Sequence, residues 1–286
     1  MNGWLIYSIP DAARNRRNIG FYLEKSAQSG IKIELLYREY IEIGVFGGKL
    51  SVKYEGRGVA PPDFAICRTI APGLTRQLEG LGVPVFNNSK VAEITGDKAR
   101  TYQYLAGKGV PLPDTRFCRW DGEESGCAAE FPIVAKPCCG RGGYAVKLIE
   151  SAQALAEYRA ERRERREDFV LQRVAGAPGR DLRVYVIGGE PVAAMLRIAE
   201  NGDIRANFCL GGRAERYELS NAERALVDRI AREFEFGFVG VDFLFDAHGG
   251  LMLNEIEDVV GARMLYIYTD VDPVRRYLEY IKDKLK

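Results

Sequence analysis

The chain has 286 residues, of which 47% are apolar and 28% charged, the composition of an ordinary globular protein with room for two or three domains. A formal net charge of +1 excludes the strongly basic surface of a nucleic-acid-binding protein. No apolar run approaches the ~18 residues of a membrane span, and the first residues lack the basic start of a signal peptide, so we expect a cytoplasmic protein with no membrane partner.

Cysteine and histidine contribute little to the expected chemistry. The six cysteines form no C-x-x-C pair, so in a reducing compartment we expect free thiols. The single histidine, His248, lies in a glycine-rich turn, which argues against histidine-based acid–base or nucleophilic catalysis. Any catalysis must therefore use cations, carboxylates, phosphates and metal ions.

The first ~90 residues alternate between strand and helix patterns. Apolar runs predict strands at residues 5–9, 31–36, 63–67 and 83–86, and helices at residues 19–29 and 74–81. Strands that alternate with helices are typical of a parallel sheet, so we expect an N-terminal α/β domain. The basic segment at residues 14–18 follows the first strand, where parallel-sheet domains bind ligands, but a solvated helix start explains it equally well.

The rest of the chain is predicted to be richer in strands. Its expected elements are a helix at residues 95–106, strands at 132–136 and 144–149, a helix from 151, strands at 169–172, 182–187 and 191–196, a helix after Ser220, a hairpin at 240–257 and a helix at 273–285. Ser220 and Glu223 form a capping-box pattern. The charge run at residues 161–167 pairs Glu161 with Arg165 at helical spacing, and we interpret it as a solvated helix end rather than a nucleic-acid patch.

Three carboxylates interrupt the apolar hairpin at residues 240–257. Side chains alternate along a strand, so Glu255 and Glu257 must share a face, about 7 Å apart. Asp242 joins them if the hairpin register places it opposite Glu255. Like charges on one face need a cation between them, and hard oxygen ligands suit Mg²⁺ with bound phosphates. Because the neighbouring residues are apolar, we favour a metal site over ordinary surface acids.

A glycine-rich loop joins two of the predicted strands. Gly140, Gly142 and Gly143 match neither the P-loop nor the dinucleotide-binding pattern, but glycines let backbone N–H groups approach an anion closely. Lys136 precedes the loop among apolar residues and needs an anionic partner, such as a nucleotide phosphate. For the loop alone, a plain hairpin tip is the alternative.

Polar residues spaced by two mark two further segments. Asp181 and Arg183 share a strand face with Tyr185, so an acid and a cation are presented together, and a structural ion pair is the alternative. Arg205 and Asn207 have the same spacing. An arginine aimed at transferring phosphate oxygens stabilises their charge without proton chemistry.

The order of these features resembles the ATP-grasp superfamily, and within it the RimK-type carboxylate–amine ligases. The resemblance extends from residue 63 to residue 257 and rests on seven motifs: Asp97-Lys98, Lys136 with its glycine loop, Gln172-Arg173-Val174, Asp181-Leu182-Arg183, Arg205 with Asn207, Asp242, and Glu255-Ile256-Glu257. It implies an α/β fold (α+β ATP-grasp): an N-terminal parallel-sheet α/β domain at residues 1–90, then a two-lobed ATP-grasp domain. The two lobes would be a central lid at residues 91–168 and a C-terminal subdomain with the metal site at residues 169–286.

The resemblance also implies a role for each motif. ATP phosphates would be held by Lys98 and Lys136 with the glycine loop, adenine by the backbone of Gln172, Arg173 and Val174, and the ribose by Asp181. The catalytic residues would be Arg183, Arg205 and Asn207, the last two facing the γ-phosphate and the acyl-phosphate that it becomes. Two Mg²⁺ ions, or Mn²⁺, would be bound by Asp242, Glu255 and Glu257.

Two departures from the family pattern concern the metal and the substrate. The family's metal motif usually reads Glu-x-Asn, whereas its last position here is Glu257, from which we expect tighter Mg²⁺ binding with activity retained. Residues 258–264 replace a Ser-Pro-Gly-type stretch near the substrate, so the identity of the acceptor does not carry over. Arg68 and Arg263 are candidates for holding a substrate carboxylate by bidentate contact, with an ordinary surface arginine as the alternative.

The predicted function is ATP- and Mg²⁺-dependent ligation of a small-molecule or peptide carboxylate to an amine through an acyl-phosphate. This chemistry needs no histidine, because positioning and charge neutralisation promote phosphoryl transfer. Two alternatives stay open. One is a small-molecule kinase of the same fold, whose product would be a phosphate ester. The other is a non-catalytic regulatory protein that binds ATP, against which the carboxylates Asp242 and Glu255 argue.

Overall fold

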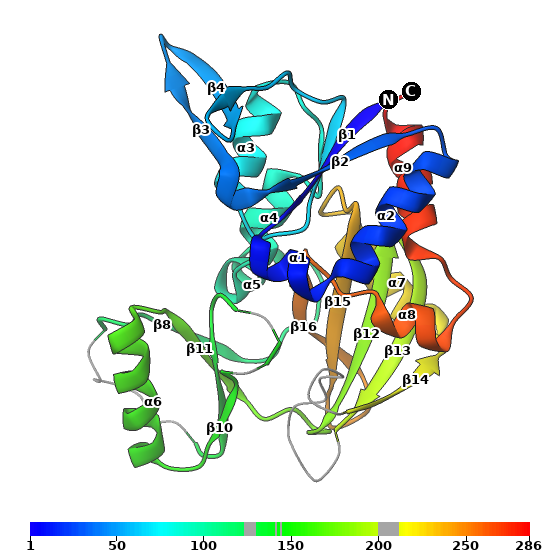
Figure 1. Ribbon diagram of the computed structural model, residues 1–286. Helices are drawn as coiled ribbons and strands as arrows, with labels where there is room; N and C mark the ends of the chain where they lie inside the picture. The colour runs from blue at the N-terminus through cyan, green and yellow to red at the C-terminus, as the bar shows by residue number, and fades with distance from the viewer. Residues whose placement is uncertain (123–129, 141, 144, 200–211) are drawn as a thin grey trace.

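A computed structural model of the chain describes residues 1–122, 130–140, 142–143, 145–199 and 212–286. Its strands form sheets of four, four, five and three strands. In Figure 1 the N-terminal part lies at the top, where the two chain ends are close together, and the two later sheets lie at the lower left and lower right. None of the described helices is long and apolar enough to cross a membrane.

The N-terminal sheet is parallel, with the strand order β2-β1-β6-β7. Its strands are β1 (Asn2–Tyr7), β2 (Lys32–Tyr37), β6 (Phe64–Cys67) and β7 (Val85–Phe86), and its helices are α1 (Ile9–Arg14), α2 (Arg16–Gln28) and α3 (Pro72–Gly80). The prediction of a parallel α/β domain is confirmed. All four residues of β6 are buried, as expected of a central strand covered on both faces.

A small antiparallel sheet in this domain was not predicted. It consists of β3 (Ile41–Phe46), β4 (Lys49–Tyr54) and β5 (Arg57–Gly58), after a short 3₁₀ helix (Arg38–Tyr40), and the β3–β4 hairpin projects from the body in Figure 1. Gly47 and Gly48 form its two-residue turn with φ of 58° and 76°, a conformation that favours glycine. The Gly-Gly pair was the available sequence signal for this hairpin.

Two short helices connect the N-terminal sheet to the rest of the chain. They are α4 (Ser89–Thr95) and α5 (Lys98–Leu105), where the sequence pattern predicts one helix at residues 95–106. The Asp97 side chain accepts a hydrogen bond from the Arg100 N–H at 3.1 Å and so caps α5. This cap makes Lys98 the first residue of α5.

The second large sheet is antiparallel, with the order β10-β9-β11-β8. Its strands are β8 (Thr115–Cys118), β9 (Ile133–Pro137), β10 (Lys147–Ile149) and β11 (Phe169–Arg173). Helix α6 (Ala152–Arg165) packs Leu155 and Tyr158 against one face of the sheet. Because β11 pairs with β8 and β9, we propose that this subdomain extends to residue 173 rather than ending at residue 168.

The charge run at the end of α6 is not a fully solvated helix end. Arg162 is 1% exposed, contacts the carboxylates of Glu161 and Glu167, and stacks over the Tyr158 ring at 5.1 Å. The predicted pair of Glu161 with Arg165 does form, at 3.7 Å. The solvated interpretation is therefore wrong for Arg162, because tertiary packing of α6 on the sheet buries the side chain that follows Tyr158 by one helical turn.

The third large sheet is antiparallel, with the order β14-β13-β12-β15-β16. Its strands are β12 (Arg180–Ile187), β13 (Glu190–Ile198), β14 (Arg213–Tyr217), β15 (Phe238–Phe245) and β16 (Leu251–Glu257), and its helices are α7 (Asn221–Ala231), α8 (Arg263–Tyr268) and α9 (Pro273–Lys284). The capping box of Ser220 and Glu223 is confirmed at the start of α7. Alternate residues of β12 join two cores, one with α7 and one with α9, so helices cover both faces of the sheet.

Side chains of the N-terminal domain tie it to the hairpin of β15 and β16. Asn87 Oδ1 accepts from the Gly237 N–H at 2.6 Å, and Asn87 Nδ2 donates to Asp258 Oδ1 at 2.6 Å. Arg68 Nη2 donates to the Val260 carbonyl. The open end of the hairpin, where β15 begins and β16 ends, and the segment that follows it are thereby held from outside the sheet.

Candidate active site

The predicted carboxylate cluster forms on the hairpin of β15 and β16. Asp242 lies directly opposite Glu255, and Glu257 follows two residues later on the same face. One oxygen from each carboxylate lies within 4.8 Å of the others. The predicted register is therefore confirmed, and the donor set is the all-oxygen kind that Mg²⁺ prefers.

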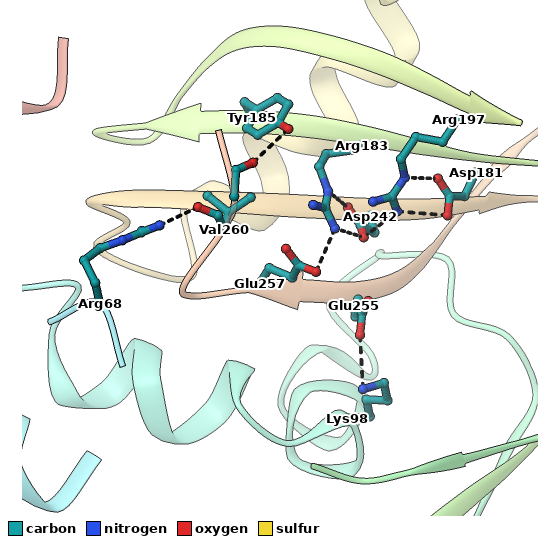
Figure 2. Close-up of polar contacts among 11 residues, drawn as sticks. Arg68, Lys98, Asp181, Arg183, Tyr185, Arg197, Asp242, Glu255, Glu257 and Val260 are labelled. Carbon is teal, nitrogen blue, oxygen red and sulfur yellow. Dashed lines mark hydrogen bonds and ion pairs between the residues drawn. The ribbon is translucent and has the colours of Figure 1, made fainter. Parts of the chain in front are cut away.

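Cationic side chains from strand β12 and helix α5 contact this cluster (Figure 2). Arg183 on β12 donates to both oxygens of Asp242, from Nε at 2.7 Å and from Nη2 at 2.6 Å. The same Nη2 lies 2.8 Å from a Glu257 oxygen. Lys98 Nζ lies 3.1 Å from Glu255, so every carboxylate of the cluster has a cationic partner within the chain.

A further buried arginine links the cluster to Asp181. Arg197 on β13 contacts Asp181 through Nε and Nη2, and its Nη2 also donates to Asp242 at 2.7 Å. Burial alone would raise the pKa of Asp242, but the two arginines lower it to about 2. Asp181 and Arg183 do not pair with each other as their shared face suggested, because each pairs across the sheet instead.

All nine residues predicted to bind the nucleotide line one cavity of ≈ 230 Å³: Lys98, Lys136, Gly140, Gly142, Gly143, Gln172, Arg173, Val174 and Asp181. The cavity lies between the second and third large sheets, and Asn254 and Glu255 line it as well. The N–H of Lys98 donates to the Cys138 carbonyl at 2.9 Å, which joins α5 to the start of the glycine loop. One cavity therefore brings together residues that are up to 157 positions apart in the sequence, from Lys98 to Glu255.

Lys136 is buried at the end of β9, as its apolar neighbours predict. Its Nζ donates to Asn254 Oδ1 at 2.7 Å. Burial is the main cause that lowers the pKa of Lys136 to about 8, and the nearby charge of Lys98 lowers it further, against the opposite effect of Glu255. The contact of this ammonium with Asn254 is to a neutral amide oxygen, and a phosphate would supply an anionic partner.

Gln172 and Arg173, two of the residues predicted to contact adenine, differ in what their side chains do. Gln172 is buried and donates to the Tyr102 hydroxyl at 3.0 Å and to Thr115 Oγ1 at 2.9 Å. Arg173 is exposed and pairs with Glu130 at 3.0 Å. The Arg173 guanidinium is therefore already paired with a carboxylate, and Gln172, Arg173 and Val174 all line the cavity.

The remaining predicted residues lie away from the cavity or outside the described part of the chain. Arg68 is buried, with its guanidinium on the Val260 carbonyl and 5.9 Å from the Phe238 ring. Arg263 begins α8 and is exposed. Arg205 and Asn207 fall within residues 200–211, which the structure does not describe.

Two residues at the site, Arg197 and Asn254, were missed by sequence reasoning. The Gly188-Gly189 turn pairs Ile187 with Glu190, which indicates that Asp181 lies near the end of β13. A register shift between Tyr185 and Val186 then places Arg197, rather than Leu196, opposite Asp181. The turn was a usable signal for the hairpin, but the shift of one residue was not visible in the sequence.

Comparisons with known proteins identify the family to which the residues lining the cavity belong. The family profile described as the RimK-like ATP-grasp domain matches residues 95–281, well over half of the chain. A protein named probable alpha-L-glutamate ligase, from Thioalkalivibrio sulfidiphilus, is 30% identical over 274 residues, which cover 92% of this chain and 91% of that protein.

Two solved structures have a similar fold. The RimK domain protein ATP-grasp from Sphaerobacter thermophilus gives a TM-score of 0.73 at 20% identity, over 99% of this chain and 100% of that chain. The D-alanine–D-alanine ligase from Bacillus anthracis, complexed with ATP, gives 0.72 at 16% identity, over 100% and 97%. The expected enzyme class, a ligase, is the class named for the relative from Thioalkalivibrio sulfidiphilus. The chain therefore belongs to the RimK-like ATP-grasp family, as the order of its motifs predicts.

Proposed function

We propose that this protein is an ATP- and Mg²⁺-dependent carboxylate–amine ligase that forms an amide bond through an acyl-phosphate and releases ADP. The observation that carries this proposal is one cavity lined by two lysines, a glycine loop, the end of β11 and Glu255, which belongs to the carboxylate cluster. These are the groups that phosphoryl transfer requires, since its catalysis rests on positioning and charge neutralisation.

The nucleotide would lie between the second and third sheets. Lys98 and Lys136 would hold its phosphates with the loop glycines, the backbone of residues 172–174 would contact adenine, and Asp181 would contact the ribose. Asp181 is already bonded to Arg197, so its carboxylate is held in a defined orientation. A pre-oriented acceptor binds a hydroxyl at lower entropic cost than a mobile one.

The carboxylates Asp242, Glu255 and Glu257 would hold Mg²⁺, and the same oxygen donors accept Mn²⁺. We propose two ions, because three carboxylates with phosphate oxygens offer enough ligands for both. Bound Mg²⁺ would neutralise charge on the transferring phosphate. In the chain itself, Lys98 and Arg183 balance Glu255 and Glu257, and bound metal ions would take over part of that charge neutralisation.

Arg183, Arg205 and Asn207 would serve the reacting phosphate. Arg183 is fixed on both sides by carboxylates and needs no rearrangement of its backbone to present positive charge at the cluster. The second sheet, with Lys136 and the glycine loop, would act as the lid that excludes water from the acyl-phosphate.

The substrate classes follow from the relatives and from one exposed cation. Since the matched relative is named a glutamate ligase, we propose glutamate or a similar amino acid as the amine and a small-molecule or peptide carboxylate as its partner. Arg263 is exposed at the start of α8, directly after the segment that follows Glu257, and would hold a substrate carboxylate. Arg68 is better placed to support that segment through Val260 than to contact the substrate.

The test measures ADP release from Mg²⁺-ATP with pooled carboxylates, amino acids and short peptides, with hydroxylamine as a trap. Carboxylate-dependent turnover that yields a hydroxamate and is lost in Glu255→Ala supports the proposal. A stable phosphate ester formed without any amine would instead identify a kinase. Tight ATP binding without turnover in any pool would favour a regulatory ATP-binding protein.

A further inference from the structure

Strand β16 carries a β-bulge at Asn254. Asp242 lies opposite Glu255 and Phe243 lies opposite Leu253, so within this fully described hairpin Asn254 has no counterpart on β15. Neighbouring residues of a regular strand face opposite sides of the sheet, and a bulge takes the extra residue out of that alternation. Asn254 and Glu255 consequently both line the cavity although they are adjacent in the sequence.

The backbone of the bulge is held by groups outside the third sheet. The Tyr102 hydroxyl on α5 donates to the Asn254 carbonyl, and the Leu253 N–H donates to the Pro111 carbonyl at 2.8 Å. Tyr102 in turn accepts from the side chain of Gln172, on β11 of the second sheet. These contacts satisfy backbone groups that a bulge removes from the ladder, so the Asn254 side chain is left to serve the cavity.

The two cavity lysines contact two neighbouring residues of β16 in different ways. Lys98 pairs with the Glu255 carboxylate, whereas Lys136 donates to the neutral amide oxygen of Asn254 at 2.7 Å. A carboxylate in place of the amide would neutralise Lys136 and compete with a phosphate for it. An amide oxygen orients the ammonium and leaves its positive charge for an anion.

We propose that Asn254 is a positioning residue for the nucleotide phosphates, which holds the Lys136 ammonium toward the cavity through its side-chain oxygen. This inference rests on the proposed nucleotide site and adds to it a residue and a geometric device, the bulge. Asn254 acts through Lys136 and need not touch the nucleotide itself.

The proposal has a consequence for the pH dependence of ATP binding. The charged groups around Lys136 are Lys98 on α5, Glu255 on β16 and Asp181 on β12. The amide oxygen of Asn254 stabilises the protonated lysine, so its loss lowers the pH at which the ammonium gives up its proton. A carboxylate at the same place raises that pH.

The experiment measures the dissociation constants of ATP and of adenosine by calorimetry from pH 6.5 to 9.5, for the wild type, Asn254→Leu and Asn254→Asp. We expect Asn254→Leu to weaken ATP binding about tenfold at neutral pH while adenosine binding stays within about twofold. The alkaline loss of ATP binding should move down by about one pH unit in Asn254→Leu and up in the isosteric Asn254→Asp. Asn221→Leu, at an exposed position that begins α7, is the matched control and should match the wild type.

Each outcome decides between the two proposals. A wild type that binds neither ATP nor adenosine overturns the proposed function itself. A wild type that binds ATP, with an Asn254→Leu variant of equal affinity and unchanged pH profile, overturns only the role of Asn254. Equal losses of ATP and adenosine in Asn254→Leu, with no opposite shift in Asn254→Asp, would show that the residue merely maintains the strand.

Discussion

Buried charges on the two sides of the cavity are balanced in different ways. On the third sheet, Arg183 and Arg197 contact Asp181, Asp242 and Glu257, so each buried charge faces an opposite charge (Figure 2). On the second sheet, Lys136 contacts an amide. The first arrangement fixes its charged side chains through mutual ion pairs, whereas the second leaves a costly charge that a ligand can stabilise.

The largest expected effect comes from breaking the paired side. Asp242→Ala removes the shared partner of Arg183 and Arg197 and leaves two buried guanidinium groups with excess positive charge. We expect the free energy of unfolding to fall by about 3–5 kcal/mol. Urea denaturation at pH 7 measures this change. Asp283→Ala, which removes an exposed acid paired with Lys286, should stay within about 0.5 kcal/mol and serves as the control.

Removing the charge of Lys136, on the second sheet, should change the free energy of unfolding in the opposite direction and stabilise the fold. Burial lowers the pKa of Lys136 from 10.5 to about 8, so between these values the folded protein binds fewer protons than the unfolded chain, and stability rises with pH. Below pH 8 the charged lysine destabilises the fold, and we expect Lys136→Met to raise the free energy of unfolding by about 2–3 kcal/mol at pH 7 while abolishing ATP binding.

Urea denaturation of Lys136→Met and the wild type at pH 7 and pH 9.5 tests that expectation. The stability advantage of the variant should shrink at the higher pH, because the wild-type lysine is then mostly neutral when folded. If the stability advantage of Lys136→Met did not change with pH, or if the variant were less stable than the wild type at pH 7, the charge of Lys136 would not be the destabilising feature that we infer.

Glu257→Asn tests whether a carboxylate that is ion-paired on the third sheet also contributes to Mg²⁺ binding. This change restores the residue usual in the family and removes one partner of Arg183, while Asp242 still accepts two hydrogen bonds from that arginine. We expect activity to persist with a severalfold weaker apparent affinity for Mg²⁺, equivalent to about 1 kcal/mol. Titration of activity with Mg²⁺ at saturating ATP measures the shift. Unchanged Mg²⁺ dependence would mean that Glu257 serves only Arg183.

The smallest effect is expected at the helix that presents Lys98. Asp97→Ala removes the N-cap of α5 and should cost about 1 kcal/mol of stability, with a few-fold loss of ATP affinity because Lys98 is the first helical residue. Asp97→Asn retains an oxygen that can cap the helix and should recover most of both losses. Equal losses in the two variants would assign the effect to the charge rather than to the cap.

Much of the fold was predictable because it depends on local pattern. The parallel N-terminal sheet follows from apolar runs that alternate with helices, and the start of α7 follows from the capping box at Ser220. The carboxylate cluster also follows locally, since Glu255 and Glu257 must share a face and a short turn brings Asp242 opposite them. The β3–β4 hairpin was missed because its strands are mostly half-buried or exposed, so that their apolar periodicity is weak.

The sequence by itself determined which chemical groups the site contains: the lysines and the glycine loop line the cavity as the family resemblance implies, and three acids form the cluster that their spacing predicts. Only the tertiary structure decided which side chains of the site contact one another. One-residue register shifts, at Tyr185 on β12 and at Asn254 on β16, place Arg197 on Asp181 and Asn254 under Lys136. Such a shift changes no composition and no local periodicity, yet it reverses which side chains face the cavity, because the alternation of a strand has a period of two.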